Sequence, residues 1–294
     1  ALKTSGFNGG RMLETSAGVG NFLGTGDYQN AHWTAVELDK TTGKILKHLY
    51  PLANVKVQGF EVTPIPLGFM DAVVSNVPFG TRSLHDPEYN KHKFRIHDYF
   101  IARGVDRLRV GGVAAFITST GALGKTDRSL IRFLEEHGGQ IVGAVRLPNK
   151  YQQKNAGTAV ASDIIFIQKV KGTANNAAFV KNGEIFGLKM NDYFVQHPEM
   201  VFATIKRGTS MHGGTPTLEF IATKDLAELP GLIKKAAEGL KFIPSNAVAK
   251  EDPITLDADK SGLRRGNIGI VNGKVVKREG DILEPVTVKW PKKY

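Results

Sequence analysis

Cysteine is absent from the 294-residue chain. This absence excludes thiol catalysis, Cys-ligated zinc sites and disulfide bonds. A chain without thiols suits a reducing compartment, and we expect a cytoplasmic protein. Long apolar runs are absent too: none approaches the roughly 20 residues that span a bilayer, and the N-terminus lacks the charged and apolar regions of a signal peptide. The sequence therefore predicts no association with a membrane.

Acidic residues are fewer than basic ones. The chain has 28 Asp and Glu against 39 Lys and Arg, which gives a net charge of +11. Such an excess favours a polyanionic partner, because basic surfaces release counterions from nucleic acid. Hydrophobic residues make up 41% of the chain and charged residues 23%, as in a folded globular protein, so long disordered or collagen-like stretches are excluded.

Short apolar runs alternate with helix-like segments between residues 11 and 170. This alternation predicts an α/β fold, with a mostly parallel sheet that carries helices on both faces and right-handed crossovers. Helices are expected at 40–50, 98–109 and 128–138, where apolar residues recur at helical spacing. The strand candidates are 11–16, 34–39, 70–76, 113–119, 141–147 and 161–170.

The composition of the sequence changes after Lys171. A small, polar stretch follows, and we predict two domains, 1–170 and 171–294. The second is expected to be a smaller C-terminal α+β appendage that supports substrate recognition. It should contain a helix within 224–240, and a hairpin over 268–280 that turns at Asn272-Gly273, the favoured two-residue turn.

A Gly-rich turn links the first expected strand to the next helix. Gly18 and Gly20 let the backbone approach a ligand closely. Leu23 stands where a dinucleotide-binding fingerprint requires a third glycine, and no Gly-Lys-Ser/Thr follows, which excludes a P-loop. Glu37 ends the next strand, where a carboxylate can accept hydrogen bonds from both ribose hydroxyls. The alternative is a helix-capping turn followed by a surface acid.

The strand at 70–76 ends in an unusual turn, Asn76-Val77-Pro78-Phe79. It lies at the edge where open α/β sheets place their ligand sites. A polar amide, a stiff turn and an aromatic ring would most often be an ordinary loop if they occurred alone. Their position after the Gly-rich turn and Glu37 favours a functional site.

These motifs together resemble the amino-methyltransferases that use S-adenosylmethionine, and especially the DNA adenine-N6 group. Glu14 to Phe22 are similar to the family's cofactor motif, Glu37 to its ribose-binding acid, and Asn76 to Phe79 to its catalytic Asn-Pro-Pro-Tyr/Phe motif, with Val77 in place of proline. The family likeness covers about residues 11–170. Methylase regions of large phage- and plasmid-borne methylase–helicase or antirestriction proteins are similar at 96–100, 111–119, 146–149, 163–166, 191–194 and 197–200.

The resemblance implies that 1–170 is a methyltransferase domain with a Rossmann-like methyltransferase fold and S-adenosylmethionine as its cofactor. The family also has a helix-and-loop element before the Gly-rich turn, and only ten residues precede Arg11 here. Glu61 is preferred to Phe60 as the residue that meets the cofactor's adenine. The implied cofactor-binding residues are Glu14, Ser16, Ala17, Gly18, Gly20, Phe22, Glu37, Leu38 and Glu61.

The resemblance also assigns roles in catalysis. The Asn76 side-chain oxygen and the Val77 carbonyl would accept the two hydrogens of an adenine N6 amine, which favours its pyramidal, nucleophilic form. Pro78 restrains Val77 to extended conformations, and Phe79 can stack on the base. A base inside a duplex cannot reach such a pocket, so the target must be flipped out or single-stranded.

Basic residues near these motifs are candidates for contacts with the substrate. Arg82, Lys93 and Arg95 follow the Asn76 turn, while Lys150 and Tyr151 follow another strand; ordinary solvated loops are the alternative for both sets. Tyr151 could pack against a flipped base. His97 and Asp98 do not have metal-ligand spacing, and we expect no metal site.

The expected activity is that of a site-specific DNA adenine-N6 methyltransferase. The implied partners are DNA and an attached or separate helicase. The same chemistry serves RNA base amines and protein glutamine amides, so those acceptors stay open. A different class also stays open: a catalytically degenerate, methylase-like DNA-binding or antirestriction module. Val77 and the short N-terminal segment favour it, while Asn76, Phe79 and Glu37 oppose it.

Overall fold

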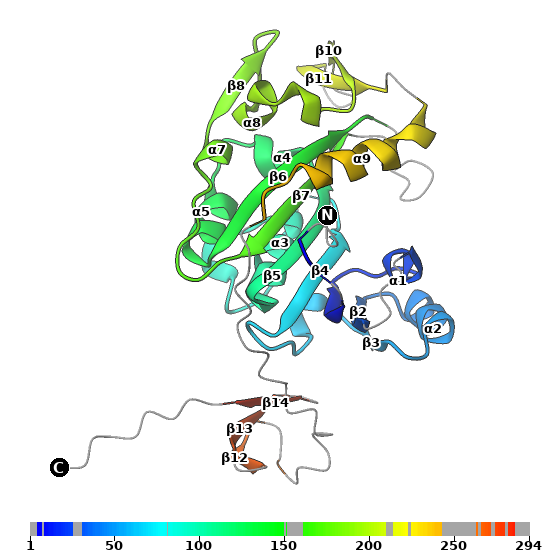
Figure 1. Ribbon diagram of the computed structural model, residues 1–294, viewed down its shortest axis with the longest axis vertical. Coiled ribbons are helices and arrows are strands. Elements are labelled where there is room, and N and C mark those ends of the chain that lie inside the picture. Colours follow the sequence, from blue (N-terminus) through cyan, green and yellow to red (C-terminus); the bar gives the residue numbers. More distant parts are fainter. Residues whose placement is uncertain are drawn as a thin grey trace, which may run out of the picture.

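A seven-stranded, mostly parallel sheet forms the centre of the molecule (Figure 1). The order of strands is β3-β2-β1-β4-β5-β7-β6, and only β7 runs antiparallel to its two neighbours, β5 and β6. This is the strand order of the Rossmann-like methyltransferase fold, so the predicted fold class is confirmed. The strands are β1 (Gly10–Glu14), β2 (Ala31–Glu37), β3 (Asn54–Val57), β4 (Met70–Asn76), β5 (Leu108–Ser119), β6 (Gly139–Leu147) and β7 (Ser162–Lys169).

The computed structural model describes most of the chain. The described residues are 5–7, 9–25, 31–80, 82–149, 151, 161–209, 214–222, 225–242, 263, 266–271, 274–279 and 282–285. None of the helices in these ranges is long and apolar enough to cross a membrane.

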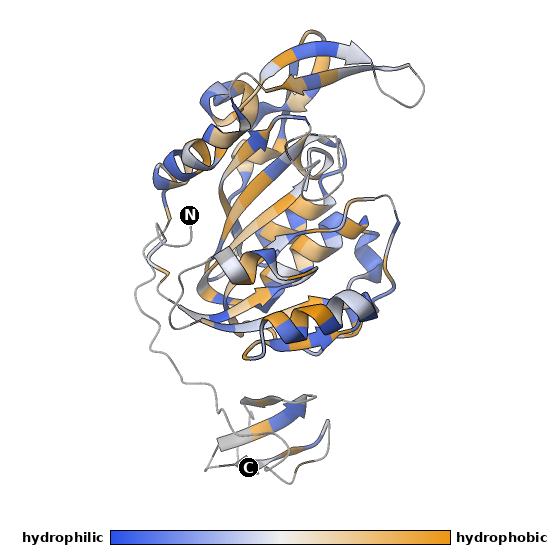
Figure 2. Ribbon diagram, turned by 90° about the vertical axis from the view of Figure 1, so that its right-hand side faces the viewer, coloured by the Kyte–Doolittle hydropathy of each residue, from blue (hydrophilic) through white to orange (hydrophobic). Residues whose placement is uncertain are grey.

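Helices cover both faces of the sheet, as predicted. Side chains alternate along each strand, so Leu13 and Val73 join the cluster on the α3 and α5 face, whereas Met12 and Val74 pack on the opposite face. Figure 2 shows mainly hydrophobic central strands, and helices in which hydrophobic and hydrophilic residues are mixed. The helical elements that follow β1 to β5 are α1 (Asn21–Thr25), α2 (Lys40–Leu49), η1 (Phe60–Val62), η2 (Asn90–His92), α3 (Ile96–Arg107), α4 (Gly121–Gly124) and α5 (Ser129–Glu136).

The three helices expected between strands are present, with shifted ends. The α2 helix begins after Asp39, whose carboxylate accepts a hydrogen bond from the Thr42 N–H at 2.7 Å and so caps it. The α3 helix ends at Arg107 rather than at 109, because β5 begins at Leu108. All twelve residues of α3 are buried.

The chain after residue 170 forms smaller α and β elements. Two-stranded sheets form from β8 and β9 and from β10 and β11, and β12, β13 and β14 form a three-stranded antiparallel sheet. The hairpin expected over 268–280 is present as β12 and β13, although Asn272 and Gly273 lie outside the described residues. The elements are α7 (Ala177–Val180), β8 (Asn182–Ile185), β9 (Leu188–Asn191), α8 (Asp192–Gln196), η3 (Pro198–Met200), β10 (Thr204–Thr209), β11 (Pro216–Ile221), η4 (Leu226–Glu228), α9 (Leu229–Glu238), β12 (Ile268–Val271), β13 (Lys274–Glu279) and β14 (Ile282–Pro285).

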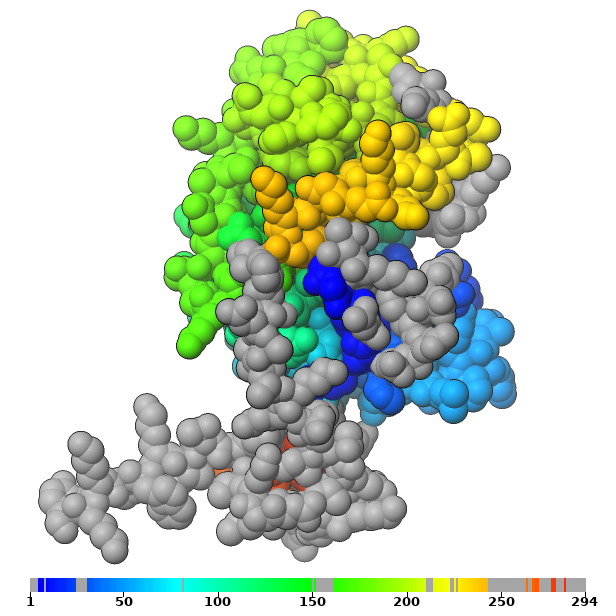
Figure 3. All heavy atoms as spheres, in the orientation of Figure 1, coloured from blue at the N-terminus to red at the C-terminus, as the bar shows by residue number. Residues whose placement is uncertain are grey.

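The α9 helix lies across the face of β6 and β7 (Figure 1). Its Ala237 and the following Leu240 pack with Val145 of β6 and Phe166 of β7. The chain then reaches the N-terminal segment, where Phe242 packs in the same cluster as Phe7. Figure 3 shows α9 in yellow and orange next to the blue N-terminal segment. The later part of the chain thus completes one face of the sheet.

Arg146 of β6 joins the sheet to the elements that follow residue 170. Its guanidinium forms two hydrogen bonds with Asp163 of β7, at 2.7 and 2.8 Å. The guanidinium carbon also lies 4.4 Å from the ring centre of Phe194 and 4.9 Å from that of Phe220. Both members of the ion pair are buried, and both rings belong to the same hydrophobic cluster as the sheet. Separate folding of 1–170 and 171–294 stays a prediction, but described residues on both sides of 170 share this cluster.

We predict that Arg146→Ala lowers the free energy of unfolding by about 3–5 kcal/mol, because it leaves the Asp163 carboxylate buried without its partner. Chemical denaturation measures this loss. The double variant Arg146→Met/Asp163→Leu should recover much of it, since it removes both charges. A loss below about 1 kcal/mol, as for an exposed ion pair, would contradict the role assigned to this pair.

Candidate functional site

Three sequence motifs meet at the carboxyl edge of the sheet, where β1, β2 and β4 end. β1 lies between β2 and β4 and pairs in parallel with both. The Gly-rich turn follows β1, Glu37 is the last residue of β2, and the Asn76 turn begins at the last residue of β4, so parallel pairing brings the three motifs together. Residues about 60 positions apart in the sequence, such as Ser16 and Asn76, are therefore in hydrogen-bond contact.

The two glycines of the Gly-rich turn both have left-handed backbone conformations, with φ of +55° at Gly18 and +88° at Gly20. A Cβ atom at Gly20 would lie 2.4 Å from the Tyr50 ring, whereas one at Gly18 would meet nothing within 4 Å. Gly20 is thus required for packing against the end of α2. Gly18 faces open space, which is the property that a ligand-binding turn needs.

Glu37 ties the turn to the end of β2. One carboxylate oxygen accepts a hydrogen bond from the Gly18 N–H at 2.7 Å, and the other accepts one from the Asp39 N–H at 2.8 Å. Each carboxylate oxygen can accept a further hydrogen bond. The half-buried carboxylate is therefore held in place while it keeps acceptor capacity for a polar ligand.

Glu14, at the end of β1, is buried, and its Oε2 atom makes no hydrogen bond to the described residues. Burial, together with the negative charge of Glu37, raises the pKa of Glu14 to about 9. Glu14 is consequently protonated at neutral pH. A positively charged group placed beside it would favour the ionised form, so the site is suited to a cation.

We predict that Glu14→Gln stabilises the protein by about 1–3 kcal/mol at pH 7. In the wild type the folded state keeps a proton that the unfolded state releases above its ordinary pKa of 4.5, so stability falls as pH rises from 4.5 towards about 9. Glutamine is neutral in both states and should abolish that fall. Denaturation at pH 5, 7 and 8.5 measures it, with the exposed Glu184→Gln as the control; a pH dependence that is unchanged in Glu14→Gln would refute the assignment.

Asn76 ends β4 with its backbone fixed at two points. The Asn76 carbonyl accepts a hydrogen bond from the Ser16 hydroxyl at 2.7 Å, and the next N–H, that of Val77, donates to the Ile117 carbonyl at 3.0 Å. The Asn76 side-chain oxygen is buried and makes no hydrogen bond to the described residues. Val77 is buried, while Pro78 and Phe79 are half-buried. A buried acceptor without a hydrogen-bond partner is rare in folded proteins, because leaving it unpaired costs free energy. A hydrogen-bond donor on a ligand could pair with the Asn76 side-chain oxygen.

The expected cofactor residues differ in their surroundings. Leu38 is 63% exposed next to Glu37. Glu61 is half-buried in η1, whereas Phe60 is buried against Phe100 with ring centres 5.2 Å apart; the assignment of Glu61 to the cofactor's adenine stays a prediction. Phe22 is half-buried and packs beside the cluster that contains Met12 and Phe7.

The expected substrate residues after the Asn76 turn lie on an anchored loop. Arg82, Lys93 and Arg95 are all exposed. Asp86 in the same loop is buried and accepts a hydrogen bond from the Tyr99 hydroxyl at 2.6 Å and one from Arg103, both on α3. The three cations are therefore displayed from a loop that is fixed to α3.

The second group of substrate candidates is less complete. Lys150 lies outside the described residues. Tyr151 is half-buried and packs against the cluster formed by β6, β7 and α9, and burial raises its pKa. This position favours a packing role for its ring. Among the described ranges there is no group of three or more His, Asp or Glu side chains that could hold a metal ion.

Sequence reasoning missed two buried hydroxyls at the carboxyl edge, those of Thr15 and Ser75. The Thr15 hydroxyl donates to Ser75 Oγ at 2.9 Å, and Ser75 Oγ lies 3.0 Å from Ser16 Oγ. The available signal was a serine directly after three apolar residues in the strand 70–76. Serine alone does not indicate its partner, because that partner is 60 residues away.

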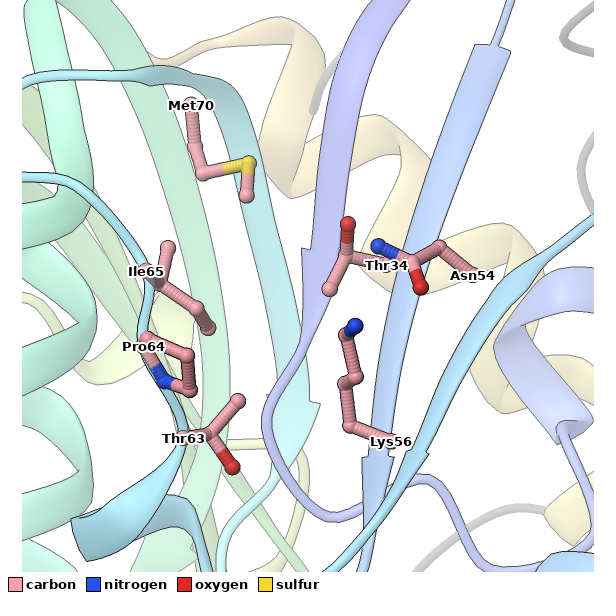
Figure 4. A pocket seen from close by; sticks show the side chains of 7 residues that line it. All are labelled: Thr34, Asn54, Lys56, Thr63, Pro64, Ile65 and Met70. Carbon is pink, nitrogen blue, oxygen red and sulfur yellow. The ribbon is translucent and has the colours of Figure 1, made fainter. Parts of the chain in front are cut away.

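A separate cavity of about 200 Å³ contains none of the expected site residues. Figure 4 shows side chains of β2 and β3 on one side of it and the segment after η1 on the other. Its lining is Thr34, Asn54, Lys56, Thr63, Pro64, Ile65 and Met70.

Comparison with known proteins finds similar solved structures, whereas no family model and no curated protein matches the chain. A protein described as a class I S-adenosylmethionine-dependent methyltransferase, from Listeria monocytogenes, is 18% identical over 56% of this chain, with a TM-score of 0.45. A modification subunit of a type I restriction enzyme from Vibrio vulnificus YJ016 is 16% identical over 56%, also at 0.45. A protein described as an RNA methyltransferase from Pyrococcus horikoshii is 19% identical over 58% of this chain and 80% of its own, at 0.42. The matched parts span 55% and 41% of the first two proteins, and similarity at this level assigns no activity, cofactor or substrate to this chain.

Proposed function

We propose that this chain binds S-adenosylmethionine at the carboxyl edge and transfers its methyl group to the N6 amine of a flipped-out adenine in DNA. The observation that carries the proposal is the buried Asn76 side-chain oxygen without a hydrogen-bond partner, next to the Gly-rich turn and Glu37. The resemblance of these motifs to adenine-N6 methyltransferases supports the same reading.

The residues at the edge fit this cofactor. Gly18 faces open space, and the Glu37 carboxylate keeps acceptor capacity for two ribose hydroxyls. The positive charges of the cofactor would favour the ionised form of Glu14, so a carboxyl group that is neutral in the free protein would become a negatively charged partner for the bound cofactor. The exposed Leu38 and the half-buried Glu61 are assigned to the adenine ring. S-adenosylmethionine supplies, when bound, a methyl group on a positively charged sulfonium.

The Asn76 turn would prepare the acceptor amine. The adenine N6 lone pair is delocalised into the ring, and two hydrogen-bond acceptors aimed at its two hydrogens favour the pyramidal form in which the lone pair becomes available. The Asn76 side-chain oxygen and the Val77 carbonyl are assigned these roles. Every residue has a main-chain carbonyl, so Val77 offers this acceptor although the family has proline at that position. Phe79 is assigned to stack on the base.

The basic loop supports a nucleic acid as the partner. Arg82, Lys93 and Arg95 are exposed on the segment between the Asn76 turn and α3. Contacts with phosphates would position a strand so that one base can leave the stack. A second candidate is DNA binding without catalysis, which Val77 favours because the family has proline there.

The decisive assay measures N6-methyladenine by mass spectrometry after incubation of the chain with S-adenosylmethionine and DNA. We expect product with the wild type and a rate at least about 100-fold lower with Asn76→Ala, because one of two transition-state acceptors is lost. Asn54→Ala, an exposed asparagine on β3, is the matched control and should retain the rate.

Parallel reactions with RNA and with a glutamine-containing peptide identify the acceptor. Methylation of RNA or peptide without methylation of DNA would contradict the proposed substrate. DNA binding without methylation of any of the three would favour the second candidate.

A further inference from the structure

Three hydroxyl groups connect the Gly-rich turn to the end of β4. Thr15 donates to Ser75 at 2.9 Å, Ser75 and Ser16 are 3.0 Å apart, and Ser16 donates to the Asn76 carbonyl at 2.7 Å. We call Thr15, Ser75 and Ser16 the hydroxyl chain. It joins the segment directly after β1 to the end of β4, and so reaches from the assigned cofactor motif to the assigned catalytic turn.

The protons of the hydroxyl chain have one consistent direction. Each hydroxyl has a single proton to donate, and a carbonyl can only accept. The Ser16 proton goes to the Asn76 carbonyl, so the bond between the two serines must use the Ser75 proton. Thr15 then donates to Ser75. All three bonds therefore point towards Asn76, and hydrogen bonds arranged in this way polarise and strengthen one another.

Burial makes the hydroxyl chain hard to replace. Ser75 is 0% exposed and Thr15 is 2% exposed. Water has little access to these two links, so an apolar residue at either position would leave buried partners without their hydrogen bonds. Ser75 is the central link, because it joins Thr15 to Ser16.

The hydroxyl chain acts on the peptide between Asn76 and Val77. Ser16 holds the carbonyl of this peptide, and the Ile117 carbonyl holds its N–H. A peptide unit is planar, so hydrogen bonds at its oxygen and at its N–H, on opposite sides of the unit, restrain the whole plane. That orientation limits the directions open to the Asn76 side chain on one side of the peptide and to the Val77 carbonyl on the other. It also commits the Asn76 main-chain carbonyl to Ser16, while the side-chain oxygen makes no hydrogen bond to the described residues.

We propose that the hydroxyl chain positions the Asn76–Val77 peptide for catalysis and couples it to cofactor binding. Thr15, Ser75 and Ser16 are positioning residues that act through Asn76. The catalytic part of this inference rests on the proposed function, because the group being positioned is the acceptor assigned there. Ser16 stands two residues before Gly18, so a ligand on the Gly-rich turn would restrict Ser16 and, through it, the Asn76–Val77 peptide. Such coupling must operate in both directions.

The first test follows hydrogen exchange of the Val77 amide and needs no activity. Ser75→Ala should accelerate its exchange about 10-fold in the free protein, because Ser16 loses the hydrogen bond from Ser75 that supports its own bond to the Asn76 carbonyl, which weakens one of the two restraints on the peptide. Ser162→Ala is the matched control: Ser162 on β7 is also 0% exposed, and its hydroxyl makes no hydrogen bond to the described residues. Equal acceleration in both variants, or in neither, would overturn the inference.

A pair of substitutions at Thr15 separates hydrogen bonding from packing. Thr15→Val keeps the shape and removes the donor, whereas Thr15→Ser keeps the donor and removes a methyl group. Valine should reproduce the faster exchange, and serine should retain the wild-type rate. The opposite order would show that packing controls the turn and would overturn the inference.

The second test measures binding and catalysis together. S-adenosylmethionine should slow exchange at Val77 in the wild type and in Ser162→Ala, and this protection should be lost in Ser75→Ala. The methyl-transfer rate constant should fall roughly 10- to 100-fold in Ser75→Ala and Thr15→Val, while the dissociation constant of the cofactor changes less than about threefold. Unchanged catalysis, or a parallel loss of cofactor affinity, would count against a positioning role. A wild type that neither binds the cofactor nor transfers methyl groups defeats the proposed function, and the exchange rates of the free proteins then decide the structural inference alone.

Discussion

The parallel pairing of β1 with both β2 and β4 is the constraint on which the site depends. Glu14 is level with Ala35 of β2, and Leu13 is level with Val73 of β4. The three chain segments that leave these strands therefore emerge side by side. The hydrogen bond from Gly18 to Glu37 and the one from Ser16 to Asn76 both follow from this register. A shift of one residue in either pairing would move the interacting side chains to opposite faces of the sheet.

The two acids of the edge have different surroundings. Glu37 accepts two backbone hydrogen bonds and is half-buried. Glu14 is buried beside that negative charge, and its pKa is raised to about 9. Both causes act on Glu14: burial disfavours its charged form, and the nearby like charge of Glu37 disfavours it further. The arrangement gives the site one fixed acceptor and one acid whose charge depends on what is bound.

Much of the fold could be predicted from the pattern of apolar runs. The strand expected at 70–76 is β4 itself, and the expected strand 161–170 differs from β7 by one residue at each end. Local patterns predicted the ends of the strands less accurately: the strand expected at 34–39 begins at Ala31 and ends at Glu37. The site motifs were visible because glycine, the acid and the Asn76 turn each follow a strand, and only the resemblance gave them roles.

The rest depends on contacts between distant residues that no local pattern encodes. The ion pair of Arg146 and Asp163 is enclosed by rings from residues 194 and 220, and a single arginine in a strand does not indicate them. Ser75 is one small polar residue in a mostly apolar strand, and the strand pattern does not indicate that its hydroxyl is hydrogen-bonded to Thr15 and Ser16 of the Gly-rich turn. Tyr151 is expected among the substrate residues because it follows a strand, and its contact with the β6, β7 and α9 cluster is not visible in the local sequence; its role stays a prediction.

The most direct measurement of the central claim, that the carboxyl edge holds S-adenosylmethionine, is a calorimetric titration of the chain with this cofactor. We expect one site whose dissociation constant rises roughly 10- to 100-fold in Glu37→Ala and less in Glu37→Gln, which keeps one acceptor oxygen; that range corresponds to about 1.4–2.8 kcal/mol. Substitution of an exposed acid away from the edge, Glu184→Ala, should leave the constant unchanged. No binding by the folded wild type, or equal binding by wild type and Glu37→Ala, would contradict the account.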